Sequence, residues 1–148
     1  MRYGRPVIRA LVVVAILAAV AASGASAAAK SPCALVTAAD ATKALGAKVG
    51  KPKLQNLGEF VSCFYSAGLR SVTVQSRSIS RSDFDKSAKA NPGPVKHLAG
   101  IGSDAYSVGG GSTLLLWKNG TAVTLLAIGT PNALATEKAL AAKVAARL

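Results

Sequence analysis

The strongest pattern in the sequence is a pair of mainly apolar stretches, 113–117 and 122–128, joined by Lys118-Asn119-Gly120-Thr121. Asn-Gly between two such stretches is typical of a β-hairpin closed by a type I′ turn, because both turn residues tolerate positive φ. A two-residue turn pairs Lys118 with Thr121, and side chains alternate between the two faces along each strand. This register predicts one apolar core face, made of Leu114, Leu116, Val123 and Leu125.

The opposite face of this hairpin is too apolar for simple exposure to solvent. It carries Leu115, Trp117, Ala122, Thr124 and Leu126. One interpretation is that a C-terminal helix covers it through Leu140 and Val144, or that the sheet is buried on both sides. The other interpretation leaves part of this face open as a binding patch with Trp117 at its rim. In that case Leu115, Trp117 and Thr124 are the candidate binding residues.

Capping residues and helical spacing predict three helices. Thr37 followed by Asp40 three residues later is typical of an N-terminal capping box, and predicts a helix over 38–45 that ends at Gly46. Ser80 or Ser82 begins a second, short helix that ends near Ala90. A third helix covers 133–148, where Leu140, Val144 and Leu148 recur every four residues on one side.

Two further strands are expected at 60–65 and 69–77, turned by Ala67-Gly68. The Gly- and Pro-rich segment 46–58 is interpreted as a connection, and 95–106 as a short strand or a loop. Strands joined by tight turns form antiparallel sheets. The sequence therefore predicts an α+β fold, with an antiparallel sheet of about four to six strands and helices packed on it.

The N-terminus has the order of a secretory signal peptide. Three arginines precede an uncharged apolar run from Ala10 to Ala22, and Ala25-Ser26-Ala27 supplies the small residues of a cleavage site. We expect a cleavable signal at 1–27 and a single domain at 28–148, secreted or associated with the cell envelope. The alternative is an uncleaved N-terminal membrane anchor, but the apolar run is shorter than the roughly 20 residues that a span needs.

The chain carries 18 Lys and Arg against 6 Asp and Glu, a formal charge of +12. Such a charge favours anionic neighbours, such as an envelope polymer or a lipid surface. A candidate anion-binding patch is formed by Lys43, Lys48, Lys51 and Lys53. The simpler interpretation is a solvated lysine-rich face with no specific partner. Stacking aromatics are few, so no specific nucleic-acid binding is expected.

The sequence has two cysteines, Cys33 and Cys63. In an exported protein, pairing is the default expectation, and neither a Cys-x-x-Cys spacing nor a neighbouring histidine favours a redox or nucleophilic thiol. We therefore predict a structural disulfide between Cys33 and Cys63.

Several short motifs resemble a loose group of small secreted or lipid-anchored actinobacterial envelope proteins of unknown function. They are the Pro32-to-Asp40 opening with Cys33, the Cys63-Phe64-Tyr65 segment, the Gly100-to-Tyr106 segment and the alanine-rich terminal helix. Ser103 before Asp104 departs from the group's pattern, as does the absence of a lipobox. The resemblance implies an α+β fold and a disulfide, and it implies no particular activity.

The candidate catalytic chemistry is sparse. Gly100-Ile-Gly-Ser-Asp-Ala105 matches a dinucleotide fingerprint in spacing, but it lacks the strand before it and the helix after it that phosphate binding needs, so a tight turn is expected. His97 with Ser103 and Asp104 could form a small hydrolase site, although no nucleophile elbow surrounds the serine. The leading hypothesis is a non-catalytic binding module without a cofactor or metal. The alternatives are a hydrolase using His97 and Ser103, or a basic protein that associates with polyanions.

Overall fold

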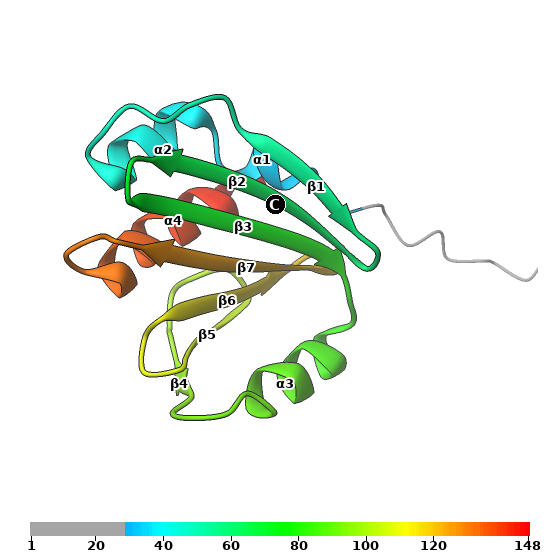
Figure 1. Ribbon diagram of the computed structural model, residues 1–148. Coiled ribbons are helices and arrows are strands. Elements are labelled where there is room, and N and C mark those ends of the chain that lie inside the picture. The colour runs from blue at the N-terminus through cyan, green and yellow to red at the C-terminus, as the bar shows by residue number, and fades with distance from the viewer. Residues whose placement is uncertain (1–28) are drawn as a thin grey trace, which may run out of the picture.

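The computed structural model describes residues 29–148, so the signal peptide predicted at 1–27 lies outside the described residues. The described helices are α1 (Pro32–Leu35), α2 (Ala38–Leu45), α3 (Arg81–Lys89) and α4 (Ala133–Arg147). The strands are β1 (Lys53–Leu57), β2 (Phe60–Ala67), β3 (Arg70–Ser78), β4 (Lys96–His97), β5 (Asp104–Val108), β6 (Thr113–Lys118) and β7 (Thr121–Ile128). They form one antiparallel sheet in the order β1-β2-β3-β7-β6-β5-β4 (Figure 1). The α+β prediction is confirmed.

The sheet has seven strands, which is more than the predicted four to six. The sequence pattern did not predict the short helix α1 or the edge strand β1, and it did not resolve the segment 95–106 into the edge strand β4 and the start of β5. Every residue of β1 is exposed, so it shows no alternation of apolar and polar positions. Its segment is also rich in Gly, Pro and Lys, residues that are depleted in strands. β4 is only two residues long and pairs Lys96 with Ser107 and His97 with Tyr106.

The main core lies between one face of the sheet and the layer formed by α1, α2 and α4 (Figure 1). The predicted hairpin register is confirmed, with Leu114 opposite Leu125 and Leu116 opposite Val123. These four side chains are buried together with Leu140 and Val144 of α4. The terminal helix therefore covers this first face. The interpretation that α4 covers the second face of the hairpin is wrong. The apolar side of α4 packs on the first face because that face is the more completely apolar of the two.

The local turn and cap predictions are confirmed. Thr37 accepts a hydrogen bond from the Asp40 amide while the Asp40 carboxylate accepts from the Thr37 amide, a complete capping box at the start of α2. Asn119 and Gly120 adopt φ values of 50° and 78°, as a type I′ turn requires.

The disulfide joins Cys33 of α1 to Cys63 of β2, as predicted. The single turn of α1 is too short to be stable by itself. The Tyr65 hydroxyl donates to the carbonyl of Val36, and Arg147 of α4 donates to the carbonyl of Leu35 at 2.6 Å. The disulfide and these two hydrogen bonds together fix α1 between the sheet and α4.

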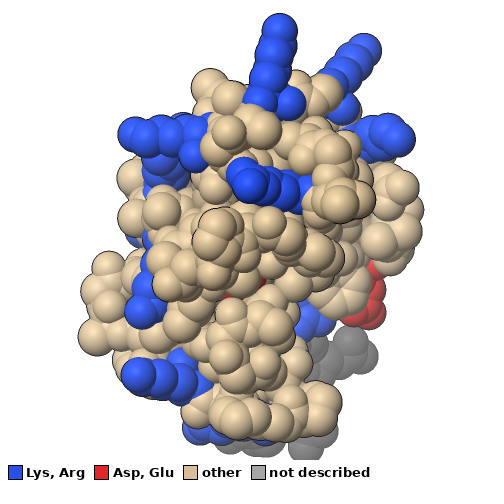
Figure 2. Space-filling model, turned by 60° about the vertical axis from the view of Figure 1, so that its left-hand side comes forward, with Lys and Arg blue, Asp and Glu red and all other residues tan. Residues whose placement is uncertain are grey.

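Charge is unevenly distributed over the domain. The side that bears α2 and the β2–β3 turn comes forward in Figure 2, where Lys and Arg side chains stand out around a surface of other residues and little acidic surface is visible. Exposed or half-buried acids lie instead near α3, at Glu59, Asp83 and Asp85. Within residues 29–148, none of the helices has the length and apolar character needed to span a bilayer.

Candidate functional site: the cleft under α3

The second face of the sheet is covered in part by α3, which begins at its N-cap Ser80. The buried ring of Phe84 packs against Tyr106 of β5 with ring centroids 5.9 Å apart. The segment that leads into the helix is held by Trp117, whose indole Nε1 donates to the Ile79 carbonyl at 2.9 Å. The helix therefore stands over one end of the sheet and leaves a seam, which we call the α3 cleft, between itself and β2, β3, β6 and β7.

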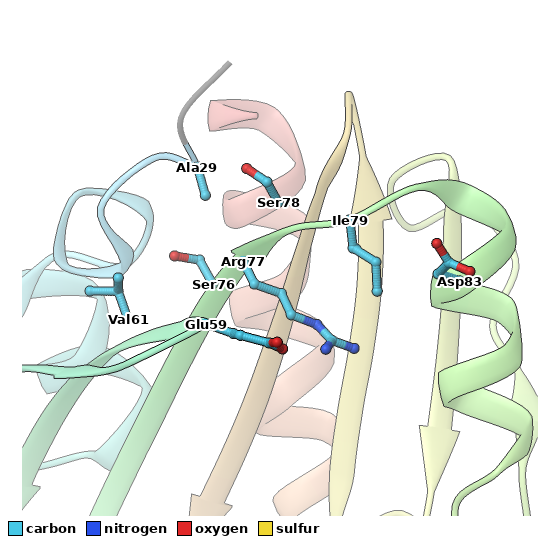
Figure 3. Close-up of a pocket in the computed structure, with 8 residues that line it drawn as sticks. All are labelled: Ala29, Glu59, Val61, Ser76, Arg77, Ser78, Ile79 and Asp83. Carbon is cyan, nitrogen blue, oxygen red and sulfur yellow. The ribbon is translucent and has the colours of Figure 1, made fainter. Parts of the chain in front are cut away.

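The larger hollow of the α3 cleft has a volume of about 640 Å³. Its walls come from the β1–β2 turn, the end of β3 and the first turn of α3, and it continues around the end of the sheet to Ala29, Val61 and Ser76 (Figure 3). Arg77 extends from β3 across the floor, Glu59 reaches toward it from the turn, and Asp83 stands on the α3 side. This end of the cleft offers one guanidinium and two carboxylates to a ligand.

The smaller hollow, of about 210 Å³, lies between α3 and the sheet. It is more apolar, and its lining includes Phe60, Phe84, Leu115 and Thr124. Arg77 lines both hollows. Its guanidinium lies 4.7 Å from the centre of the Phe60 ring and donates to the Ser87 hydroxyl at 3.1 Å, so a cation–π contact and a hydrogen bond hold it at the junction.

The structure places two of the three candidate binding residues in this cleft. Leu115 and Thr124 line the smaller hollow, whereas Trp117 lies beside it under the segment before α3. Sequence reasoning missed Phe60, Arg77 and Phe84. Phe60 and Arg77 share the second face with Leu115, a relation that appears only once the β2–β3–β7–β6 order is known.

The only histidine of the chain belongs to a separate polar cluster. The His97 Nε2 lies 2.8 Å from one Asp104 carboxylate oxygen, and Arg81 lies 3.3 Å from the other. Asp104 is buried, while the His97 side chain is 58% exposed. The histidine thus pairs with Asp104, and no contact joins it to Ser103 among the described residues.

Tyr106 closes the same cluster. Its ring lies edge-on to His97 at 5.3 Å, and its hydroxyl donates to Asp85 at 3.2 Å. Burial, together with the negative charges of Asp104 and Asp85, raises the pKa of the Tyr106 phenol, so it remains a donor at neutral pH. Neither hollow of the α3 cleft is lined by His97 or Ser103.

The Gly100–Ala105 segment is a tight turn, as expected. Gly100 and Gly102 have φ values of 79° and 62°, and the chain then enters β5, with no helix at this point to receive a phosphate. A Cβ on Gly102 would lie 3.1 Å from the Trp117 carbonyl oxygen, so glycine also permits this close approach. Within residues 29–148, no three His, Cys, Asp or Glu side chains are grouped as metal ligands.

A second surface feature lies between α2 and α4. Asp40 accepts from Lys143 at 2.5 Å and from Arg147 at 2.6 Å, which ties the start of one helix to the end of the other. Burial alone would raise the pKa of Asp40, but hydrogen bonds from Arg147, Lys143 and Thr37 hold it well below its usual range. The carboxylate therefore stays ionised between two cations.

We expect Asp40→Asn to lower the free energy of unfolding by about 1–2 kcal/mol, since both ion pairs are lost but Lys143 and Arg147 are partly exposed and can be rehydrated. Urea denaturation at pH 7 measures this. Asp83→Asn, at the corresponding position of the α3 cap, is the matched control and should have a smaller effect because Asp83 is exposed. The difference in free energy of unfolding between the wild type and Asp40→Asn should disappear as the pH falls below about 4, where Asp40 begins to be protonated in the unfolded chain. An equal loss in both variants would show that only helix capping is affected.

The candidate anion patch is spread over several elements. Lys43 lies near the end of α2, Lys48 and Lys51 in the connection after it, and Lys53 on β1, and all four are exposed. Lys43 lines the groove between α2 and α4, while the other three line neither this groove nor the α3 cleft.

Comparisons with protein-family models, with curated proteins and with solved structures gave no match to this chain.

Proposed function

We propose that this protein is a non-catalytic binding module of the cell exterior and that the α3 cleft is its ligand site. One observation carries the proposal: a hollow of about 210 Å³ between α3 and the sheet and a hollow of about 640 Å³ at the end of the sheet, beside the first turn of α3, share Arg77. Ligand sites are concave, with apolar walls and a few convergent polar groups. The cleft combines both, since Phe84 and Leu115 form an apolar end while Glu59, Arg77 and Asp83 form a polar one.

The chemistry of the cleft favours a ligand with two unlike ends. An apolar group would contact Phe84 and Leu115, and hydrogen-bonding groups would lie beside Arg77. Arg77 already has a partner in Ser87 and a platform in Phe60, so it is held in place before a ligand arrives. Such preorganisation lowers the entropic cost of binding.

The competing hypothesis is a small hydrolase that uses His97 and Ser103. Binding is the better supported of the two, because His97 contacts Asp104 and Tyr106, and this cluster lies outside both hollows. If the protein is a hydrolase, His97→Ala should lose hydrolytic activity while remaining folded. That result would favour the hydrolase over the binding module.

The location outside the cytoplasm is supported by the signal-like N-terminus and by the disulfide, a bond that persists in oxidising compartments. The envelope of an actinobacterium would agree with the resemblance of the Cys33 and Cys63 segments. The high positive charge would hold such a protein near anionic polymers or lipid head groups.

A bulky substitution in the smaller hollow tests the site. Thr124→Phe should weaken binding of the neutral fluorescent probe N-phenyl-1-naphthylamine at least about tenfold, because the ring fills a space of about 210 Å³. Thr73→Phe is the matched control, since Thr73 is a half-buried threonine on the same face but outside the cleft. Probe titration followed by fluorescence measures both variants. Equal binding by wild type and Thr124→Phe would refute the proposed site.

A further inference from the structure

A groove of about 390 Å³ runs between α2 and α4, on the opposite side of the sheet from α3. Its apolar lining consists of Ala44, Ala135, Ala139 and Leu140. Residues 135 and 139 are four apart and therefore lie on the same side of α4. Because alanine side chains are too short to fill the space between two helices, the groove remains open along this line. Its volume falls within the range of small-molecule sites, about 300–1,000 Å³.

Two lysines flank this apolar surface. Lys43 is exposed and makes no hydrogen bond or ion pair within the described part of the chain, so its ammonium is available to a ligand. Lys143 donates one hydrogen to Asp40 at 2.5 Å, and its side chain is still 43% exposed. An ammonium group has three donors, so two remain for a ligand.

One carboxylate, that of Asp40, also lines the groove, but its two oxygens are already paired with Lys143 and Arg147. The other acid of the two helices, Glu137, is fully buried. The other four acids lie on the β1–β2 turn, α3 and β5. Figure 2, which shows the side that bears α2, has many Lys and Arg side chains and little acidic surface. The surroundings of the groove therefore attract anions.

We propose that the α2–α4 groove binds a single-chain anionic amphiphile, with its acyl chain along Ala44, Ala139 and Leu140 and its carboxylate or phosphate between Lys43 and Lys143. The apolar lining matches the chain, and the two lysines match the head group. This inference does not rest on the function proposed for the α3 cleft.

The probe for the test is decanoate, below its micelle concentration, with binding measured by calorimetry. Ala139→Phe fills the groove from an exposed position of α4 and should weaken binding by about tenfold or more, the effect of displacing about two buried methylenes. Ala142→Phe is the matched control, because Ala142 is exposed on the same helix but does not line the groove. The affinity of Ala142→Phe for decanoate should stay within about twofold of the wild-type affinity.

The head-group contact is tested separately. Lys43→Ala should weaken decanoate binding about three- to fivefold, as expected for one exposed ion pair, and Lys48→Ala should leave it unchanged because Lys48 does not line the groove. Decanol, which lacks the charge, should bind more weakly than decanoate. These decanoate titrations are repeated in the Thr124→Phe background, whose α3 cleft is filled, so that binding in the groove is told from binding beside Arg77.

Three outcomes would overturn the inference. The first is no binding of decanoate, and the second is equal weakening by Ala139→Phe and Ala142→Phe. The third is equal weakening by Lys43→Ala and Lys48→Ala, which would indicate diffuse attraction to the basic surface. If the first outcome is found and the protein is still retained on vesicles of anionic phospholipid, this face is assigned to a membrane surface instead of a single amphiphile.

Discussion

Removal of the disulfide should lower the free energy of unfolding by about 3.5 kcal/mol, the largest effect that we expect from any single change to this chain. Cys33 and Cys63 are 30 residues apart, and closing a loop of this size restricts the unfolded chain by about that amount in the entropy model. The bond also ties α1 to the sheet, so its loss leaves this four-residue helix, which is too short to be stable by itself, with only the hydrogen bonds from Tyr65 and Arg147 and its own packing. Urea denaturation of Cys33→Ala/Cys63→Ala measures the change.

The wild type with and without a reductant gives the control. Reductant should bring the wild type close to the stability of the double variant and should leave the double variant unchanged, because this variant has no cysteine. A wild type whose unfolding curve does not move in reductant would contradict the expected contribution of the bond.

Glu137 should make the protein less stable as the pH rises from about 5 to 8. The side chain is fully buried between α4 and β7, where one carboxyl oxygen accepts from the Ala127 amide at 2.9 Å and the other oxygen has no hydrogen-bond partner in the described residues. Burial raises the pKa of Glu137 to about 7, and the hydrogen bond from Ala127 offsets only part of this effect. The folded protein therefore holds a proton that the unfolded chain releases near pH 4.5.

The sign and size of this dependence follow from proton linkage. Between pH 4.5 and 7 the folded state binds more protons than the unfolded state, so the free energy of unfolding falls as the pH rises. The total loss is about 3 kcal/mol, at ~1.4 kcal/mol for each unit of the pKa difference. Glu137→Gln should remove this slope when unfolding by urea is measured from pH 5 to pH 8.

Glu59→Gln is the control for the Glu137 experiment, since Glu59 is an exposed acid on the β1–β2 turn and should retain the wild-type slope. The same pH dependence in Glu137→Gln and in the wild type would mean that another group is responsible. Glu137→Gln replaces the carboxyl group by an amide of nearly the same shape, so the variant tests the charge of Glu137 and not the packing of α4.

Local interactions explain which parts of the fold the sequence could predict. The Asn119-Gly120 turn sets the β6–β7 register through two positive φ angles, and Thr37 and Asp40 satisfy the free amides at the start of α2. Each of these elements depends on residues that are neighbours in the chain. The pairing of Cys33 with Cys63 needed only the absence of another candidate partner.

The candidate site depends on long-range packing, and this is why it was only partly predicted. Leu115 and Thr124 could be assigned to one face from the hairpin alone. The placement of Arg77 beside them required β3 to pair with β7, and the placement of Phe84 required α3 to cross to the second face. β1 was missed for a different reason, because an exposed edge strand buries too little apolar surface to leave a pattern in the sequence.

The two free edges of the sheet have a consequence for how the protein behaves in concentrated solution. An edge strand exposes unpaired backbone amides and carbonyls, and two molecules can join through them into a continuous, growing sheet. Here β1 carries Lys53 and follows Lys51, and β4 is only two residues long and includes Lys96. Edge-to-edge polymerisation is thus opposed by mutual repulsion at one edge and by the lack of a sufficient template at the other. The surplus of lysine, whatever else it binds, also acts as a colloidal stabiliser.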